Sequence, residues 1–151
     1  MPQSLSQVWI HLVFSTKERR PFLQNAGFRE EMFRMLSHHV IEAGCSAKRS
    51  GGWIDHVHIV CGLSRTVTIA QLVEQVKTET SKWAKSHADG SKSFSWQAGY
   101  GVFSVSQSNL EQVLTYVENQ GSHHSRRSYQ EEFRELCRKH GVEFDEQYVW
   151  D

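Results

Sequence analysis

The sequence lacks the features that direct a protein to a membrane or out of the cell. It has no apolar stretch of about 18 residues, so no transmembrane helix is expected. Residues 1–4 lack the basic and apolar regions of a secretory signal. Cys45, Cys61 and Cys137 are scattered and form no Cys-x-x-Cys pair, which argues against a zinc ribbon and a disulfide framework. A reducing cytoplasm is the expected location.

Excess charge is also absent. The chain has 17 Lys and Arg against 17 Asp and Glu, and a net charge of zero is low for a nucleic-acid-binding protein. The balance is +3 in residues 1–65, +1 in residues 66–130 and −4 in residues 131–151. This distribution favours local phosphate contacts over a broad cationic surface, although an ordinary solvated surface explains it equally well. Seven basic residues are candidates for DNA binding by their charge and placement alone. They are Lys17, Arg19, Arg20, Lys48, Arg49, Lys82 and Lys85.

No repeat, low-complexity segment or linker divides the 151 residues, so one domain with a buried core is predicted, ending in an acidic tail of about ten residues. Apolar spacing predicts strands and helices in the order β, α, β, β, α, β, α, followed by another helix. The predicted strands are 7–14, 45–50, 53–61 and the later part of 91–106, and the predicted helices are 25–43, 68–87, 108–121 and 128–141. This order indicates an α+β protein with a ferredoxin-like antiparallel sheet and helices on one face.

Local motifs support these boundaries. Three capping boxes, starting at Thr68, Ser108 and Ser128, are expected to open the last three helices. The pair Gly51–Gly52 is expected to form a tight turn between the second and third strands. Gly121 is expected to end the third helix.

The strand 53–61 carries two histidines, His56 and His58. Side chains alternate along a strand, so both imidazoles point to the same face and could bind one metal ion from a rigid support. An isolated His-x-His is a weak signal, and a strand whose polar face happens to carry two histidines is the alternative.

The predicted helix 108–121 carries Tyr116 and, one turn later, Gln120. A tyrosine hydroxyl has a pKa of about 10 and is a poor nucleophile near neutral pH. A divalent ion held by two imidazoles and an amide oxygen would orient a phosphodiester and offset its developing charge. Tyr116 could then attack the phosphorus and form a covalent phosphotyrosine. Three protein ligands leave positions open for the substrate.

These residues resemble a known family. His56-Val57-His58 is similar to the His-hydrophobic-His motif of HUH nucleases, and the segment 116–120 resembles the tyrosine helix of single-tyrosine HUH transposases. The blocks 11–17, 52–58 and 96–104 are typical of the small TnpA-type transposases of IS200-like insertion sequences. The resemblance covers roughly residues 5–150, with the blocks in the expected order.

The resemblance implies an enzyme that cuts and rejoins single-stranded DNA at the ends of a mobile element and recognises imperfect hairpins there. Tyr116 would leave a 5′-phosphotyrosine and a free 3′-hydroxyl, with Mg²⁺ or Mn²⁺ held by His56, His58 and Gln120. Ligand softness favours Mn²⁺ for imidazoles, so Mg²⁺ rests on the family. The resemblance also implies a homodimer.

Two other functions fit the same residues. A related HUH enzyme, acting on host repeated palindromes or as a replication initiator, would share the chemistry but have a different substrate. A catalytically silent protein that binds single-stranded or hairpin DNA would share only the scaffold, and an intact Tyr116 with both histidines argues against it.

Overall fold

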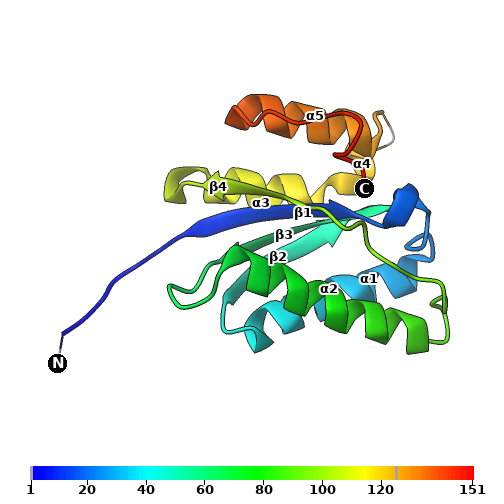
Figure 1. The fold of residues 1–151 in the computed structure, drawn as a ribbon, viewed down its shortest axis with the longest axis horizontal. Coiled ribbons are helices and arrows are strands. Elements are labelled where there is room, and N and C mark those ends of the chain that lie inside the picture. The colour runs from blue at the N-terminus through cyan, green and yellow to red at the C-terminus, as the bar shows by residue number, and fades with distance from the viewer. Residues whose placement is uncertain (1, 125) are drawn as a thin grey trace.

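The computed structural model describes residues 2–124 and 126–151, and its centre is a four-stranded antiparallel sheet in the order β2-β3-β1-β4 (Figure 1). The strands are β1 (Trp9–Ser15), β2 (Ser46–Gly52), β3 (His56–Gly62) and β4 (Gly101–Val105). The predicted antiparallel pairing of β2 with β3 is confirmed. All seven residues of both β1 and β3 are buried, because these two central strands are covered on both faces.

One face of the sheet is covered by α1 (Ala26–Glu42) and α2 (Ile69–Ser86), which lie below the sheet in Figure 1. Alternate residues of β1 and β3, including Leu12, Phe14 and Ile59, form the main core with these helices. Thr68 caps α2 with the complete predicted capping box. The remaining residues of the same strands point to the other face.

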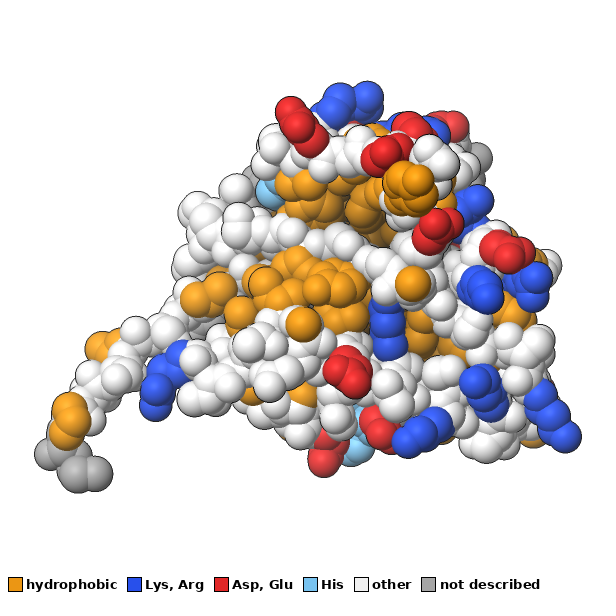
Figure 2. All heavy atoms as spheres, viewed as in Figure 1, with side chains coloured by type: hydrophobic (Ala, Val, Ile, Leu, Met, Phe, Trp, Pro, Cys, Tyr) orange, Lys and Arg blue, Asp and Glu red, His pale blue; other side chains and the backbone are white. Residues whose placement is uncertain are grey.

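The second face is covered by α3 (Leu110–Glu118) and α5 (Tyr129–His140). Leu114 of α3 belongs to a cluster with Val60, and Phe133 of α5 to a cluster with Val13. Figure 2 shows apolar side chains gathered between α5 and β4, with charged side chains on the outer side of α5. The α+β class and the antiparallel sheet are confirmed, but helices cover both faces, because Trp9 and Val13 of β1 also offer apolar contacts to α3 and α5 on the second face.

Several local boundaries differ from the prediction. Ser108 does not cap α3, because residues Gln107–Asn109 form a short 3₁₀ turn (η2) that leads into the helix. Gly121 does not end α3 either: the helix stops at Glu118, and a separate short helix, α4, spans Gln120–His124.

The glycine pair 51–52 was predicted as a turn but forms the end of β2, and residues 53–55 make the connection to β3. The reason is a close helix approach. A Cβ atom on Gly51 would lie 2.5 Å from the carbonyl oxygen of Val117 in α3. Gly101 of β4 likewise leaves room for the ring of Phe133 in α5, which a Cβ atom would approach to 2.6 Å. These two glycines let α3 and α5 lie close to the sheet.

The C-terminal part of the chain is anchored to the same face. Ser128 accepts a hydrogen bond from the backbone amide of Glu131 at the start of α5, and Gly141, with φ of 65°, ends the helix as predicted. In the acidic tail, Trp150 contacts the rings of Tyr129 and Phe133. Across the described ranges, no helix combines the length and apolar character needed to cross a membrane.

Candidate active site

The two histidines of β3 lie on the face of the sheet that α3 and α5 cover. Strand alternation places them opposite Val57 and Ile59, which point into the main core. His56 and His58 are both fully buried. His58 Nδ1 lies 2.7 Å from Nε2 of His11, a buried residue of β1. His56 Nδ1 lies 2.8 Å from the carboxylate of Asp55. The Nδ1 atom of each ring therefore has a hydrogen-bond partner. Both Nε2 atoms face the space under α5.

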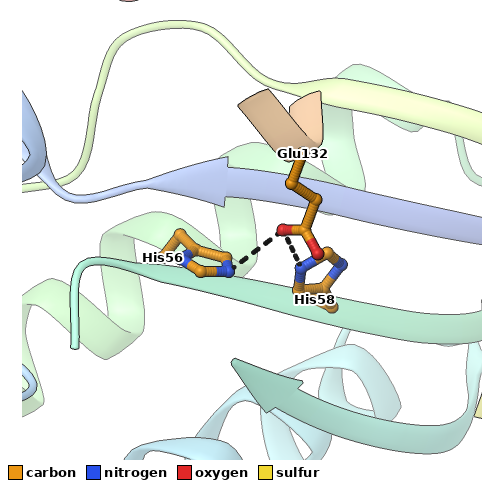
Figure 3. Close-up of side chains that lie close together, drawn as sticks. All are labelled: His56, His58 and Glu132. Atoms are coloured by element: carbon orange, nitrogen blue, oxygen red, sulfur yellow. Dashed lines mark hydrogen bonds and ion pairs between the residues drawn. The ribbon is translucent and has the colours of Figure 1, made fainter. Parts of the chain in front are cut away.

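Glu132 of α5 fills that space (Figure 3). One oxygen of its carboxylate, Oε1, lies 3.3 Å from His56 Nε2 and 3.0 Å from His58 Nε2. The same oxygen lies 3.1 Å from Nε2 of His124, the last residue of α4. Glu132 is itself fully buried, so this carboxylate is the centre of a desolvated cluster with three imidazoles.

The other carboxylate oxygen, Oε2, faces the predicted nucleophile. It accepts hydrogen bonds from the hydroxyl of Tyr116 and from Nε2 of Gln120, the latter at 3.1 Å. The amide oxygen of Gln120 lies 3.0 Å from His56 Nε2. The two oxygens of Glu132 therefore divide their contacts between the histidines and the pair of Tyr116 and Gln120.

The charges of the cluster follow from these contacts. Burial would raise the pKa of Glu132, but its electrostatic interaction with His58 and hydrogen bonds from His124, His56 and His58 outweigh burial and hold the pKa far below its usual range. Burial would lower the pKa of His56, yet hydrogen bonds to Asp55 and Glu132 raise it to about 9. For His58, burial prevails and lowers the pKa. At neutral pH, the cluster holds a carboxylate and an imidazolium.

The hydroxyl of Tyr116 remains protonated in this state. Burial first, and then the charge and hydrogen bond of Glu132, raise its pKa above the ordinary value. The phenolate would lie against the Glu132 carboxylate, which disfavours it. The hydroxyl is thus positioned by the cluster but not ionised by it.

The raised pKa of His56 predicts a pH dependence of stability in the metal-free protein. His56 binds its proton more tightly in the folded state, with a pKa of about 9 against 6.5 in the unfolded chain, so it stabilises the fold fully below pH 6.5. This contribution declines as the pH rises and is lost through pH 9. We expect the difference in free energy of unfolding between wild type and His56→Asn to shrink between about pH 6 and about pH 9.5.

Urea denaturation in the presence of a chelator measures that difference. His38→Asn, at an exposed histidine of α1, is the control for loss of an imidazole. A difference between wild type and His56→Asn that stays constant over this pH range would show that folding does not raise the pKa of His56.

The cluster also fits a divalent cation. His56, His58 and Glu132 each offer one ligand atom, and these atoms lie within 4.8 Å of one another. The amide oxygen of Gln120 faces the same space from α4. Two imidazoles with oxygen ligands form a donor set that suits first-row divalent ions such as Mn²⁺.

The structure brings together the four residues singled out from the sequence: His56, His58, Tyr116 and Gln120. Their roles stay predictions, since only their positions are observed. Sequence reasoning missed Glu132. A signal was present, because Glu132 interrupts the apolar stripe formed by Tyr129, Phe133 and Leu136, and a charged residue at such a position is rarely buried unless it is paired.

The seven basic DNA-binding candidates lie in three separate places. The first three, Lys17, Arg19 and Arg20, follow β1, where Arg19 lies over the ring of Trp150. Lys48 and Arg49 lie on β2, and Arg49 pairs with Glu118 at 3.5 Å.

The last two candidates, Lys82 and Lys85, lie on α2, on the face of the sheet opposite the histidine cluster. The structure therefore does not gather the seven into one surface around the site, and their DNA contacts remain predictions.

Both the fold and the sequence of the chain are similar to those of known proteins. Solved structures that share the fold include the following two. A proposed transposase from Deinococcus radiodurans is 20% identical with a TM-score of 0.59, over 80% of this chain and 95% of that one. A REP-associated tyrosine transposase bound to a REP hairpin is 16% identical with a TM-score of 0.54, over 82% of this chain and 74% of that one. None of the curated proteins matches the chain significantly.

The sequence itself matches the family model described as "Transposase IS200 like" over residues 4–120. This range includes all four strands, both histidines of β3 and the helix that carries Tyr116. Glu132 and α5 lie beyond it. Because the match extends over well more than half of its length, this chain belongs to the family of IS200-like transposases.

Proposed function

We propose that this protein cleaves and rejoins single-stranded DNA at the ends of an insertion sequence through a 5′-phosphotyrosine on Tyr116. The observation that carries the proposal is the hydrogen bond from the Tyr116 hydroxyl to Glu132, in the same cluster as His56 and His58. A tyrosine held beside a candidate cation site has the arrangement that nucleophilic attack on a phosphodiester requires.

The two carboxylate oxygens of Glu132 would have different roles: Oε2 accepts a proton and Oε1 binds the divalent ion. Oε2 accepts the hydrogen bond of the Tyr116 hydroxyl and is the nearest group to receive its proton. As this proton is transferred, the phenolic oxygen attacks the phosphorus, a Tyr–phosphate bond forms, and the bond from phosphorus to the 3′-oxygen breaks. The departing oxygen takes up a proton from solvent and becomes a free 3′-hydroxyl. Attack by a 3′-hydroxyl on the phosphotyrosine reverses these steps and rejoins the strand.

His56, His58 and Oε1 of Glu132, with the amide oxygen of Gln120, would hold the divalent ion, Mg²⁺ or Mn²⁺. When bound, this ion would neutralise charge on the phosphate and orient it. Asp55 and His11 keep the two imidazoles in place by their contacts with the Nδ1 atoms. Such outer contacts orient metal-binding histidines in general.

We further propose that the substrate is single-stranded DNA with imperfect hairpins, that the protein acts as a homodimer, and that it works in the cytoplasm. The REP-associated neighbour is described as bound to a REP hairpin, which supports a DNA hairpin as the ligand here. The same observation favours one alternative: action on repeated palindromes of the host rather than on the ends of a mobile element.

A labelling experiment tests the proposal. The protein is incubated with a single-stranded oligonucleotide that carries an imperfect hairpin from the DNA flanking its own gene, with Mn²⁺, Mg²⁺ or a chelator. A label on the 3′ side of the cleavage site is expected to migrate with the protein on a denaturing gel. A label on the 5′ side is expected in a released fragment with a 3′-hydroxyl.

The location of the label shows whether a covalent adduct forms and which side of the cleaved strand it carries. Binding without any adduct in either metal would remove the enzyme proposal and favour the silent hairpin-binding protein. An adduct that retains the 5′-side label would mean a 3′-phosphotyrosine and reverse the assigned polarity. Repeated host palindromes in place of the flanking hairpin test the alternative substrate.

A further inference from the structure

A groove of about 520 Å³ opens beside Tyr116, outside the histidine cluster. It lies between α3 and α5, with His11 of β1 and residues of β4 at its base. Its volume falls within the range of about 300–1,000 Å³ that is typical of sites for small ligands. Tyr116 lines the groove and also contacts Glu132, so the groove lies next to the candidate active site.

Both walls of the groove continue from the residues of that site. On the α3 side, Gln112 and Asn109 lie one and two turns before Tyr116 and line the groove with it. On the α5 side, Leu136 and Lys139 lie one and two turns after Glu132. The groove therefore begins where Tyr116 and Glu132 meet and extends along the same faces of both helices.

The charged groups of the groove favour an anion. Arg127 and Lys139 both line it. The acidic side chain in the lining, Glu135, forms an ion pair with the guanidinium of Arg138 at 2.6 Å. Among the ion pairs of residues 2–124 and 126–151, none involves Arg127 or Lys139. Two cationic side chains thus remain available beside the candidate nucleophile.

The other lining groups match a nucleobase. Val113 and Leu136 offer apolar surface from opposite walls, suited to the face of a base. Asn109 and Gln112 offer amide groups, each with both donors and acceptors, suited to the edge of a base. The groove therefore offers cationic groups to the phosphate of a nucleotide, apolar groups to the face of its base and amide groups to the edge of its base.

We propose that this groove binds the unpaired nucleotides next to the scissile phosphate and that Gln112 sets the base preference there. The proposal rests on the proposed function and names the substrate segment for the same site. Lys139 and Arg127 contact the backbone phosphates, and the amide of Gln112 contacts the base edge. A groove of about 520 Å³ takes a few nucleotides and not a duplex stem, so it affects the choice of cleavage sequence and not the affinity for the hairpin.

Two variants test the proposal kinetically, with a series of oligonucleotides that share one hairpin and differ in the bases flanking the cleavage site. Gln112→Ala is expected to reduce wild-type discrimination between flanking bases by roughly fivefold to a hundredfold, the value of one base-edge contact. Lys139→Ala is expected to raise KM for every flanking sequence and to lower the salt dependence by about 0.7 in log–log slope.

Matched controls are Gln75→Ala on α2 and Lys92→Ala in the loop after α2, both remote from the groove. Hairpin affinity is measured in parallel and is expected to stay constant in all four variants. If Gln112→Ala and Lys139→Ala retain the wild-type sequence profile and KM, as the controls should, the groove does not carry the DNA strand.

A second measurement is independent of catalysis. Tyr116→Phe protein is bound to a hairpin oligonucleotide with 4-thiothymidine next to the cleavage position, irradiated, digested and mapped by mass spectrometry. We expect cross-links in peptides that contain residues 109–116 or 135–140. Cross-links confined to α1 or α2 would overturn the proposal. Groove cross-links without any adduct in wild type would refute the proposed chemistry but support the groove, whereas an adduct with cross-links elsewhere would do the reverse.

Discussion

Replacing Tyr116 by phenylalanine is expected to abolish the covalent protein–DNA adduct. The variant lacks the oxygen that would form the bond to phosphorus, and among the described residues Tyr116 is the tyrosine whose hydroxyl donates a hydrogen bond to Glu132. Removing a catalytic nucleophile lowers the rate by roughly 10³-fold or more. Radiolabelled substrate with Mn²⁺, followed by a denaturing gel, measures the loss.

The fold and hairpin binding should survive this change. Phenylalanine keeps the ring of Tyr116, and Oε2 of Glu132 keeps its hydrogen bond from Gln120. We expect the free energy of unfolding to change by about 1–2 kcal/mol at most. Tyr148→Phe, at an exposed tyrosine of the tail, is the matched control and should retain the full adduct. If an adduct persists in Tyr116→Phe, Tyr100 and Tyr129 become the next candidates for the nucleophile.

Replacing Glu132 by alanine is expected to produce the largest loss of stability. The carboxylate is fully buried and is the common partner of His56, His58 and His124. Removing one partner of a buried ionic group typically costs about 3–5 kcal/mol, because the remaining groups are left desolvated and unpaired. Urea denaturation in a chelator measures the change in the free energy of unfolding. Glu131→Ala, at the exposed neighbouring residue, is the control and should change it by less than about 0.5 kcal/mol.

Glu132→Gln separates the structural role from the chemical one. The amide has nearly the same shape and can still accept a hydrogen bond, so most of the stability should return. It cannot receive the proton of Tyr116, and we expect adduct formation to fall by roughly 10²- to 10⁴-fold. A Glu132→Gln protein that forms the adduct at the wild-type rate would limit Glu132 to a structural role.

The position of the histidine pair was predictable from local pattern alone. Strand alternation places His56 and His58 on one face whatever the rest of the fold does, and the structure has them there. The pairing of β2 with β3 and the cap of α2 at Thr68 were likewise predictable, because each depends on a few neighbouring residues. These features depend on interactions between residues that are close together along the chain.

Other features depended on contacts between distant segments. The glycines 51–52 have the composition of a turn, yet Gly51 lies in β2 because the backbone of α3 approaches it closely at Val117. The break between α3 and α4 at Asn119 separates Tyr116 from Gln120, although their spacing is that of one helical turn. Glu132 keeps both in contact through its Oε2 atom.

The sequence by itself determined the α+β class, the histidine pair, the tyrosine helix and the resemblance to the transposase family, since periodicity and short motifs encode these locally. Only the tertiary structure decided that α3 and α5 cover the second face and that Glu132 lies between His56, His58 and Tyr116. Glu132 is 74 residues from His58 along the chain. The physical reason is that a buried carboxylate depends on partners from other elements, and no local pattern specifies which elements will meet.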